Sequence, residues 1–553
     1  MTSGPARLST MQRWTLVLSC LAIVLIIASM AALYTALPQI VSSTGATQQQ
    51  LTWIVDSYTL ALACLVLPGG ALGDRYGRRA ALVVGLAIFA AASLVPVFVD
   101  GVGWLIAARA VAGVGAALVM PSTLSLLTAS FPESRRGLAV GIWAGMAGAG
   151  AVVGIIGSGV LVEHWSWQSI PLAMGIAGAV FTIASCTLPE SADPARPPFD
   201  LPGSALSSLA VGLLVLAMVE VPARGWTHPV PWGAIAGSVL AGAVFVVVEL
   251  RTRHPLLDVR LFLRRGFGSG ALSVAIQFLV SFGLFLLIVQ YMQLILGYGP
   301  LWSALALAPM VGPMMLLSPI APRMAERFGL RVPTVLGLIT LGIGLLSVAT
   351  LSTDSGYADL VWPLLITSTG IGLATAPATA AIVSGVPTGN HGVAAAVNDA
   401  AREVGAAVGI ALAGSMLAAG YSDRITSTVA ALPEQLRGPV SDSLAATLQV
   451  TAHLGPQADP LAQAASAAFV HGTGQAAIAL GVLTLVSAVV IGFLAPGRVR
   501  AAPSVESSSV ESDAAESTTA DSGSAEEPGQ GGQDLEVAGC GERALGHGSG
   551  ERL

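Results

Sequence analysis

The sequence predicts an all-α protein that crosses a membrane many times. Of its 553 residues, 54% are hydrophobic and only 10% are charged, whereas soluble domains carry about 25% charged residues. Apolar runs of about 20 residues recur along most of the chain, and such runs cross the hydrocarbon core as helices because lipid offers no partner for unpaired backbone groups. A motif of charged and glycine residues occurs twice, which indicates two related helical bundles.

Fourteen apolar runs are candidate membrane spans. The first run follows Arg7 and Arg13, as a signal peptide would, but it is long enough to anchor the chain and thirteen further runs follow. We therefore interpret it as a retained span. The expected spans lie near residues 14–38, 51–72, 80–99, 104–127, 137–161, 167–188, 202–221, 231–250, 267–290, 302–321, 333–351, 361–384, 394–419 and 476–495.

The arginines predict the orientation, because basic residues in short loops are retained on the cytoplasmic side. The chain contains no lysine, and only Arg224, Arg424 and Arg437 fall on the face opposite to the termini. The loop arginines on the same face as both termini are Arg75, Arg78, Arg79, Arg135, Arg136, Arg196, Arg251, Arg253, Arg260, Arg264, Arg265, Arg323, Arg327 and Arg331. We expect a multi-pass protein of the inner or plasma membrane with both termini in the cytoplasm.

Three segments are expected to lie outside the membrane. They are a cytoplasmic N-terminus at 1–13, an external loop at 420–475 and a tail at 497–553. The tail is dominated by Ser, Gly, Glu and Asp, so it has too few apolar residues to offset the entropy cost of ordering. We expect it to be a disordered acidic cytoplasmic segment.

The loops after the second and tenth spans contain the same motif. Residues 70–79 read GALGDRYGRR and residues 322–331 read PRMAERFGLR, so an acid, an arginine, an aromatic residue and a glycine recur in one order. The copies are eight spans apart rather than six. We therefore expect six-helix bundles at 14–190 and 267–496, with two inserted, peripheral helices, the seventh and eighth, at 202–250.

These motifs resemble those of a known transporter family. The loop at 70–79 resembles the signature loop of the major facilitator superfamily, and 105–117, with Arg109 among small residues, is similar to its fourth-span motif. The fourteen spans and the stretch 390–415 resemble its drug:proton antiporter branch. The resemblance implies the major facilitator fold, with two six-helix bundles and two inserted central helices. It also implies a secondary active transporter that exports hydrophobic or cationic drugs or antibiotics in exchange for protons by alternating access.

An acid among the arginines of the signature loop suggests a gating role. Asp74 could pair with charges of the other half in one access state and lose that pair in the other. The alternative is that the loop only sets topology, although an acid serves that purpose poorly. The candidate gating residues of the two copies are Gly73, Asp74, Arg75, Gly77, Arg78, Glu326 and Arg327.

Charged residues inside the spans are candidate proton-coupling groups, because a charge facing lipid costs at least about 2.5 kcal/mol. Arg109 lies in the fourth span, and Asp56 enters the second span to a similar depth, so Asp56 is its leading candidate partner. We hypothesise that Asp56 carries the proton and that Arg109 adjusts the proton affinity of Asp56. The alternative is that the two residues form a salt bridge that does not titrate.

Asp399, Arg402 and Glu403 share one face of the thirteenth span. The modest interpretation is a local ion pair between Asp399 and Arg402. Glu403 lies deeper, where it could attract a cationic drug, serve as a second proton site or only pack against its neighbours. Asp399 and Glu403 therefore join the candidate proton-coupling residues.

Aromatic residues near the outer ends of the first two spans are candidate substrate-binding residues. Trp53, Tyr58 and Tyr34 could line an outer cavity and stack on flat cations, although Trp and Tyr also gather at membrane interfaces.

The fifth span carries glycines that would let helices approach closely, namely Gly145, Gly154, Gly157 and Gly159. They resemble the antiporter motif of the family, except that Ile155 stands where that motif usually has proline. A second departure is Ser29, which stands where many relatives carry a first-span aspartate.

Other function classes have less support. The alternative within transport is export or import of a neutral or anionic metabolite such as a siderophore or lipid, and a membrane sensor or scaffold is weaker. No metal-ligand spacing occurs in the spans, the four cysteines show no paired spacing, and an ATP-binding loop needs the lysine that this chain lacks. We therefore expect no enzyme activity, cofactor or metal, and no nucleic-acid partner. The expected partners are a small-molecule substrate, protons and the lipid bilayer, for a monomeric chain.

Overall fold

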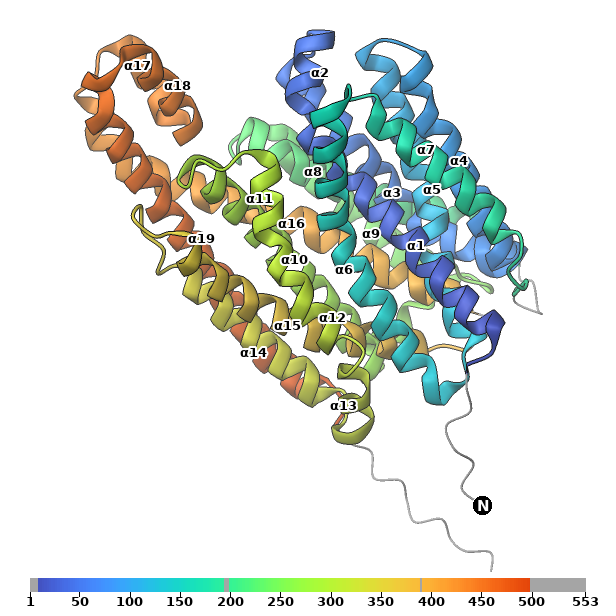
Figure 1. Cartoon of the computed structure of the whole chain (residues 1–553). Helices are drawn as coiled ribbons and strands as arrows, with labels where there is room; N and C mark the ends of the chain where they lie inside the picture. Colours follow the sequence, from blue (N-terminus) through green and yellow to red (C-terminus); the bar gives the residue numbers. More distant parts are fainter. Residues whose placement is uncertain (1–7, 193–197, 388–389, 498–553) are drawn as a thin grey trace, which may run out of the picture. The chain divides into compact units, whose positions relative to one another are not determined.

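The computed structural model describes residues 8–192, 198–387 and 390–497, and all regular structure in these ranges is helical (Figure 1). Twelve helices are long and apolar enough to cross a membrane. They are α1 (Thr10–Ala32), α3 (Gln48–Tyr76), α4 (Arg78–Phe98), α5 (Val102–Ser130), α6 (Glu133–His164), α8 (Leu201–Arg224), α9 (Pro229–Arg251), α10 (Arg265–Leu294), α14 (Arg331–Val348), α15 (Tyr357–Ser384), α16 (His391–Ala430) and α19 (Asp459–Leu494).

Two further predicted spans have less regular counterparts. The tenth is a broken helix, bent by 40° between Leu301–Leu317 and Ala321–Phe328. It comprises α11 (Pro300–Leu307), η3 (Ala308–Met310), α12 (Val311–Leu317) and α13 (Ala321–Phe328). The sixth is α7 (Ser169–Ser185), whose 17 residues reach the lower limit for a span. The structure is thus compatible with fourteen crossings, and that number remains a prediction.

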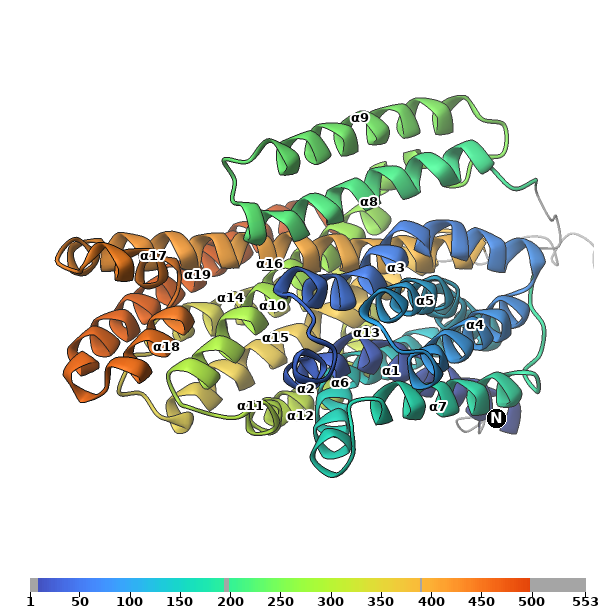
Figure 2. The ribbon, with the colours of Figure 1, turned by 90° about the horizontal axis from the view of Figure 1, so that it is seen from above.

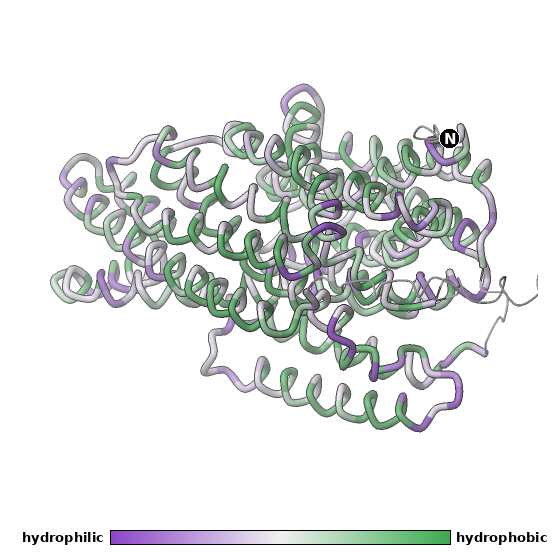
Figure 3. The backbone as a smooth tube through the Cα atoms, turned by 90° about the horizontal axis from the view of Figure 1, so that it is seen from below, coloured by the Kyte–Doolittle hydropathy of each residue, from purple (hydrophilic) through white to green (hydrophobic). Residues whose placement is uncertain are grey.

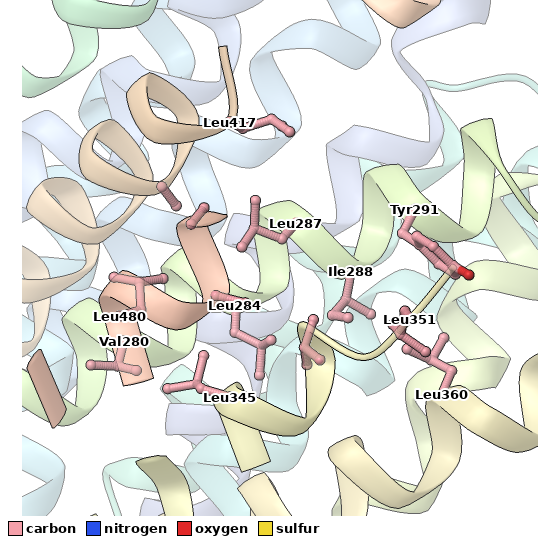
Figure 4. Close-up of a cluster of buried hydrophobic side chains, with 14 of the residues drawn as sticks. Val280, Leu284, Leu287, Ile288, Tyr291, Leu345, Leu351, Leu360, Leu417 and Leu480 are labelled. Atoms are coloured by element: carbon pink, nitrogen blue, oxygen red, sulfur yellow. The ribbon is translucent and has the colours of Figure 1, made fainter. Parts of the chain in front are cut away.

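Two six-helix bundles form around separate buried clusters. In the N-terminal bundle α5 packs on α3 and α4, α1 on α6, and α7 on α4; in the C-terminal bundle α10 packs on α16, and α14 on α15 and α19. Figure 4 shows side chains of α10, α14, α16 and α19 meeting in the C-terminal bundle. The labelled residues include Val280, Leu284, Leu287, Ile288, Leu345, Leu417 and Leu480.

Small residues set the closest approaches between helices, as expected where lipid supplies no hydrophobic driving force. A Cβ atom at Gly154 of α6 would collide with the backbone of Ala28 in α1, and one at Gly409 of α16 would collide with Leu279 in α10. Hydrophobic residues run along the helices, while hydrophilic residues gather at many of the turns (Figure 3). This is the pattern of a multi-pass membrane protein.

The hairpin of α8 and α9 lies at one side of the bundles (Figure 2). Helix α8 contacts α3 and α16, whereas α9 packs on α8 and on the short helix η2 (Val259–Leu263). The pair therefore occupies the peripheral position expected for inserted helices.

The segment 420–475 differs from the expected external loop because most of it is helical. Helix α16 continues to Ala430, α19 already begins at Asp459, and α17 (Glu434–Asp442) and α18 (Leu444–Leu454) lie between them, followed by η5 (Pro456–Ala458). The hydroxyl of Tyr421 lies 3.0 Å from the carbonyl oxygen of Val440, which is fully buried. Alanine and leucine favour helix here, and the buried residues Tyr421, Val440 and Leu444 join the hydrophobic cluster of the C-terminal bundle. The expected acidic tail is outside the described residues from residue 498 onward.

The remaining short helices follow the first span. They are η1 (Leu33–Thr35), which extends α1, and α2 (Leu37–Thr44), which ends at Gly45 in the left-handed conformation.

Candidate functional site

A cavity lies between the two bundles, and its walls are largely apolar and aromatic. Helices α1, α5 and α6 contribute one side, and α10, η3, α12, α15 and α16 contribute the other. The lining residues are Ile27, Met30, Met120, Trp143, Ala144, Ala147, Gly148, Ala151, Val152, Gln277, Phe278, Ser281, Phe282, Phe285, Met310, Val311, Met314, Ile371, Thr375, Arg402, Glu403 and Ala406. We call this space the central cavity.

The charged part of the central cavity is formed by α16. The Asp399 carboxylate is fully buried, and its Oδ1 lies 3.6 Å from Nη1 of Arg402 and accepts a hydrogen bond from Asn398. The Arg402 guanidinium lies 4.4 Å from the ring of Phe278 and 5.5 Å from that of Trp143. The predicted ion pair between Asp399 and Arg402 is confirmed, and aromatic faces add cation–π attraction to it.

Glu403 follows Arg402 and also lines the central cavity. Its side chain is partly buried, and within the described residues no hydrogen bond or ion pair holds its carboxylate. An acid that forms no ion pair in the described part of the chain is chemically able to bind a proton or a cationic ligand.

Neutral polar residues of α10 and α15 complete the cavity wall. Thr375 donates a hydrogen bond of 2.7 Å to Oε1 of Gln277, and the Gln277 amide donates one of 2.7 Å to Ser273. Sequence reasoning missed this pair, and also missed Trp143 and Phe278. The signal available for Gln277 was an amide within an otherwise apolar span.

Arg109 has a different environment from the one that the sequence predicted. No hydrogen bond or ion pair joins it to Asp56 in the part of the chain that the structure describes. Its Nε donates to the carbonyl oxygen of Ile54 over 3.3 Å, its Nη1 to the hydroxyl of Ser29 over 3.0 Å, and its guanidinium lies 4.2 Å from the ring of Tyr58. The expected pair was wrong because depth along two helices does not determine which faces they turn to each other.

The three predicted substrate-binding aromatics do not line the central cavity. Tyr58 is fully buried inside the N-terminal bundle, where its hydroxyl donates to the carbonyl oxygen of Ile26 over 3.0 Å. Tyr34 is 55% exposed in η1, and Trp53 is partly buried in α3. The prediction was therefore wrong for Tyr58, because an amphipathic ring near a helix end is equally suited to the bundle core. For Tyr34 and Trp53, an outer-cavity role stays a prediction beside the alternative of an interface position.

The signature motif at 70–79 was expected in a loop, but it is helical: it lies at the end of α3 and the start of α4, with only Gly77 between them. It forms a buried contact with the other bundle, which we call the Asp74 cluster (Asp74, Arg78, Gly392 and Val393). The Asp74 carboxylate forms an ion pair of 2.7 Å with Arg78 and accepts backbone hydrogen bonds from Gly392 (2.9 Å) and Val393 (3.0 Å). These amides belong to the first turn of α16, whose N-cap residue Asn390 makes no side-chain capping bond. Asp74 therefore caps a helix of the opposite bundle, and its negative charge is favourable at that helix N-terminus.

The sequence suggested that Asp74 pairs with charges of the other half, and the structure shows a different contact. The arginine paired with Asp74 belongs to the same half, and the bond between halves is made to backbone amides. The turn between α3 and α4 is made at Gly77, which has a φ of 116°. Beside this turn, the backbone amide of Arg78 donates to the carbonyl oxygen of Ser191 over 2.8 Å, and Arg79 forms an ion pair with Glu190.

The other residues of the two motif copies take different positions. Gly73 faces Ser122 of α5, and the Arg75 guanidinium lies 5.3 Å from the ring of Tyr76. In the second copy, Arg327 lies 5.4 Å from the ring of Phe328, and Glu326 lies beside Gly137 of α6. Within the described residues no ion pair to Glu326 or Arg327 is formed.

Three of the four predicted packing glycines in α6 lie at contacts. Gly145 faces Ser318 and Met315, Gly154 faces the Ala28 backbone, and Gly159 faces Leu301, whereas a Cβ at Gly157 would meet open space. The assignment of Gly157 was therefore wrong. Helix α6 runs without interruption past Ile155.

A family comparison fits this geometry. A model described as Major Facilitator Superfamily matches residues 19–410. The chain belongs to the major facilitator superfamily, a family of membrane transporters for small molecules.

Several curated relatives in this superfamily match most of the chain. The multidrug efflux pump LfrA of Mycolicibacterium smegmatis is 33% identical over 494 residues, which is 89% of this chain and 98% of that protein. The methyl viologen resistance protein SmvA of Salmonella typhimurium is 31% identical, covering 86% and 97%. The tetracenomycin C resistance and export protein of Streptomyces glaucescens is 30% identical, covering 82% and 86%.

Solved structures support the superfamily fold. The proton:xylose symporter XylE aligns with a TM-score of 0.55 over 88% of this chain and 96% of its own, and the human organic anion transporter MFSD10 aligns with 0.56 over 87% and 100%. Both are 14% identical in sequence, so they bear on the fold alone.

Proposed function

We propose that this chain exports hydrophobic or cationic small molecules, such as drugs or antibiotics, in exchange for protons by alternating access. The proposal rests on Glu403, a carboxylate in an aromatic cavity between the bundles that forms no ion pair with any described residue. The names of LfrA and SmvA add support, since those relatives are a multidrug efflux pump and a methyl viologen resistance protein.

The central cavity suits flat, apolar cations. Phe278, Phe282, Phe285 and Trp143 offer ring faces and apolar area, and Glu403 offers one negative charge. Arg402 also lines the cavity, but its charge is balanced by Asp399 at 3.6 Å. A ligand with one positive charge would therefore meet a site with one uncompensated acid.

Exchange follows if Glu403 binds either a proton or a cationic ligand. A proton arriving from the external side neutralises the carboxylate and weakens its attraction for the cation, which then leaves. When the cavity opens to the cytoplasm, loss of the proton restores the charge for the next ligand. Asp399 and Arg402 position this site, and Asp56, partly buried in α3 of the other bundle, remains our second candidate for the proton.

The Asp74 cluster would control the access state. We place it at the cytoplasmic end, with both termini in the cytoplasm, because that end carries the arginine-rich loops. The hydrogen bonds from α16 to Asp74 then hold the cytoplasmic ends of the bundles together, and their loss accompanies opening to the cytoplasm. One chain forms the whole cavity, so we expect the monomer to be sufficient.

Transport in proteoliposomes tests the proposal. With ethidium or a quaternary ammonium compound as substrate, an inward-directed proton gradient should drive coupled substrate and proton movement by the wild type. Glu403→Gln should abolish both fluxes, whereas Asp423→Asn, which alters an exposed acid on the same helix, should leave them unchanged.

Two outcomes would overturn parts of the proposal. Wild-type proton flux in Glu403→Gln would remove Glu403 from coupling, and Asp56→Asn should then be the variant that abolishes it. Substrate movement without any proton flux in the wild type would refute antiport.

A further inference from the structure

The buried cation Arg109 of the N-terminal bundle contacts neutral groups, with no charged partner among the described residues. The Arg109 side chain is 7% exposed, and its donors reach the Ile54 carbonyl and the Ser29 hydroxyl, both uncharged. The ring of Tyr58 covers one face of the guanidinium at 4.2 Å. Its Nη2 is buried without a hydrogen-bond partner, and no carboxylate of the described residues pairs with it.

Such a charge is costly without a counter-ion. Removing the partner of a buried ion pair is strongly destabilising, because one charge then remains uncompensated in a low-dielectric interior. One cation–π contact and hydrogen bonds to neutral oxygens offset only part of this cost. The N-terminal bundle therefore needs a negative charge that its own side chains do not supply at Arg109.

A small cavity adjoins Arg109 between α1, α4, α5 and α7. Its polar lining residues are Ser29, Ser93 and Arg109, so it presents hydroxyl and guanidinium donors and no carboxylate. The rest of its wall is apolar, formed by Leu33, Ala92, Pro96, Leu105, Ala108, Ala112, Ile170, Pro171 and Met174. None of these residues lines the central cavity, so the two spaces are distinct.

We propose that this cavity binds one small monovalent anion, with chloride as the physiological candidate, as the counter-ion of Arg109. The free Nη2 and the hydroxyls of Ser29 and Ser93 supply the donors. A single guanidinium balances one negative charge, and the apolar wall disfavours strongly hydrated dianions such as sulfate. The site goes beyond the proposed drug export and does not depend on it.

Equilibrium dialysis of the purified full-length chain in detergent against radioactive chloride tests the proposal, with gluconate keeping the ionic strength constant. The wild type should bind chloride saturably, close to one ion per chain. Ser29→Asp should lose chloride binding at least tenfold, because a carboxylate beside Nη1 supplies the counter-ion covalently. Ser93→Ala, which removes one donor and leaves the charge of Arg109 unchanged, should weaken binding only several-fold.

A second measurement covers the case in which Ser29→Asp does not fold. Chloride should raise the thermal unfolding midpoint of the wild type more than gluconate at equal ionic strength, with the same concentration dependence as chloride binding. Absence of saturable chloride binding by the wild type, or equal chloride binding by folded Ser29→Asp, would overturn the proposal. Because neither assay involves transport, failure here leaves the drug-export proposal unaffected, and the reverse also holds.

Discussion

Each bundle buries an arginine, but the two bundles differ in how the charge of that arginine is balanced. Arg402 in the C-terminal bundle is 6% exposed and Arg109 in the N-terminal bundle is 7% exposed, and each lies against an aromatic ring. Among the described residues, Arg402 has an acid, Asp399, within ion-pair distance, and Arg109 has none.

The difference shows which group balances the charge of the buried arginine in each bundle. Because Asp399 compensates Arg402, Glu403 remains free for a ligand or proton in the central cavity. Because serine rather than an acid contacts Arg109, the N-terminal bundle has a cation to be neutralised by a bound anion. The two motif copies are also unequal, since Asp74 contacts the opposite bundle through two backbone amides and Glu326 forms no ion pair in the described part of the chain.

The largest expected effect on stability comes from removing the acid that pairs with Arg402, which would leave Arg402, like Arg109, without an acidic partner. Asp399→Asn removes the partner of Arg402 and should lower the free energy of unfolding by about 3–5 kcal/mol. Denaturation in mixed micelles measures this loss. The matched control Asp423→Asn, at an exposed position of the same helix, should change stability by less than about 0.5 kcal/mol. A loss below about 1 kcal/mol in Asp399→Asn would mean that another group balances Arg402 and would break the comparison.

The second prediction compares the two motif copies. Asp74→Asn removes the charge from the N-terminus of α16, and hydrogen bonds to charged groups contribute about 1.5–3 kcal/mol each. The closed cytoplasmic state should therefore lose at least about tenfold in population, and transport should fall accordingly while membrane insertion persists. Ethidium efflux from vesicles measures this, with Glu326→Gln as the control that retains activity within about twofold. Equal losses in both variants would show that the copies act symmetrically.

How much of this could be predicted from the sequence depends on the kind of interaction. Each predicted span overlaps a helix because long apolar runs have no alternative in lipid. The ion pair of Asp399 and Arg402 was predictable because both lie on one helix. The pairing of Asp56 with Arg109 was not, because it required the rotation of two helices about their axes. Phe278 and Trp143 were equally hidden, since an apolar ring can face lipid, the bundle core or a cavity.

A third, smaller effect concerns the backbone of the motif copies. Gly77 has φ of 116°, and a Cβ there would lie 2.6 Å from the Glu190 carboxylate, so Gly77→Ala should cost about 1–3 kcal/mol of stability. Gly329, at φ of 85°, occupies the matching position of the second copy, and Gly329→Ala should cost about 1–2 kcal/mol. Thermal unfolding of both variants measures the difference. A larger loss at Gly329 would contradict the view that the first copy is the more constrained.

The smallest expected effect is at Tyr58. Tyr58→Phe retains the ring over Arg109 but removes the hydrogen bond to Ile26, so stability should fall by about 0.5–1.5 kcal/mol. Chloride binding should remain within about twofold of the wild type, because the charge of Arg109 is unchanged. Dialysis and thermal unfolding of the same preparation measure both quantities. Loss of chloride binding in this variant would show that the hydroxyl, rather than the ring, organises the guanidinium.

The central claim is that Glu403 binds either a proton or a cationic ligand. The most direct test of this claim is to measure proton release when substrate binds. The purified protein is placed in weakly buffered solution at a series of starting pH values and titrated with a quaternary ammonium compound while the pH is recorded. The wild type should release close to one proton per bound cation, Asp423→Asn should do the same, and Glu403→Gln should release none. Undiminished proton release by Glu403→Gln, or substrate binding by the wild type without proton release at any pH, would contradict the account.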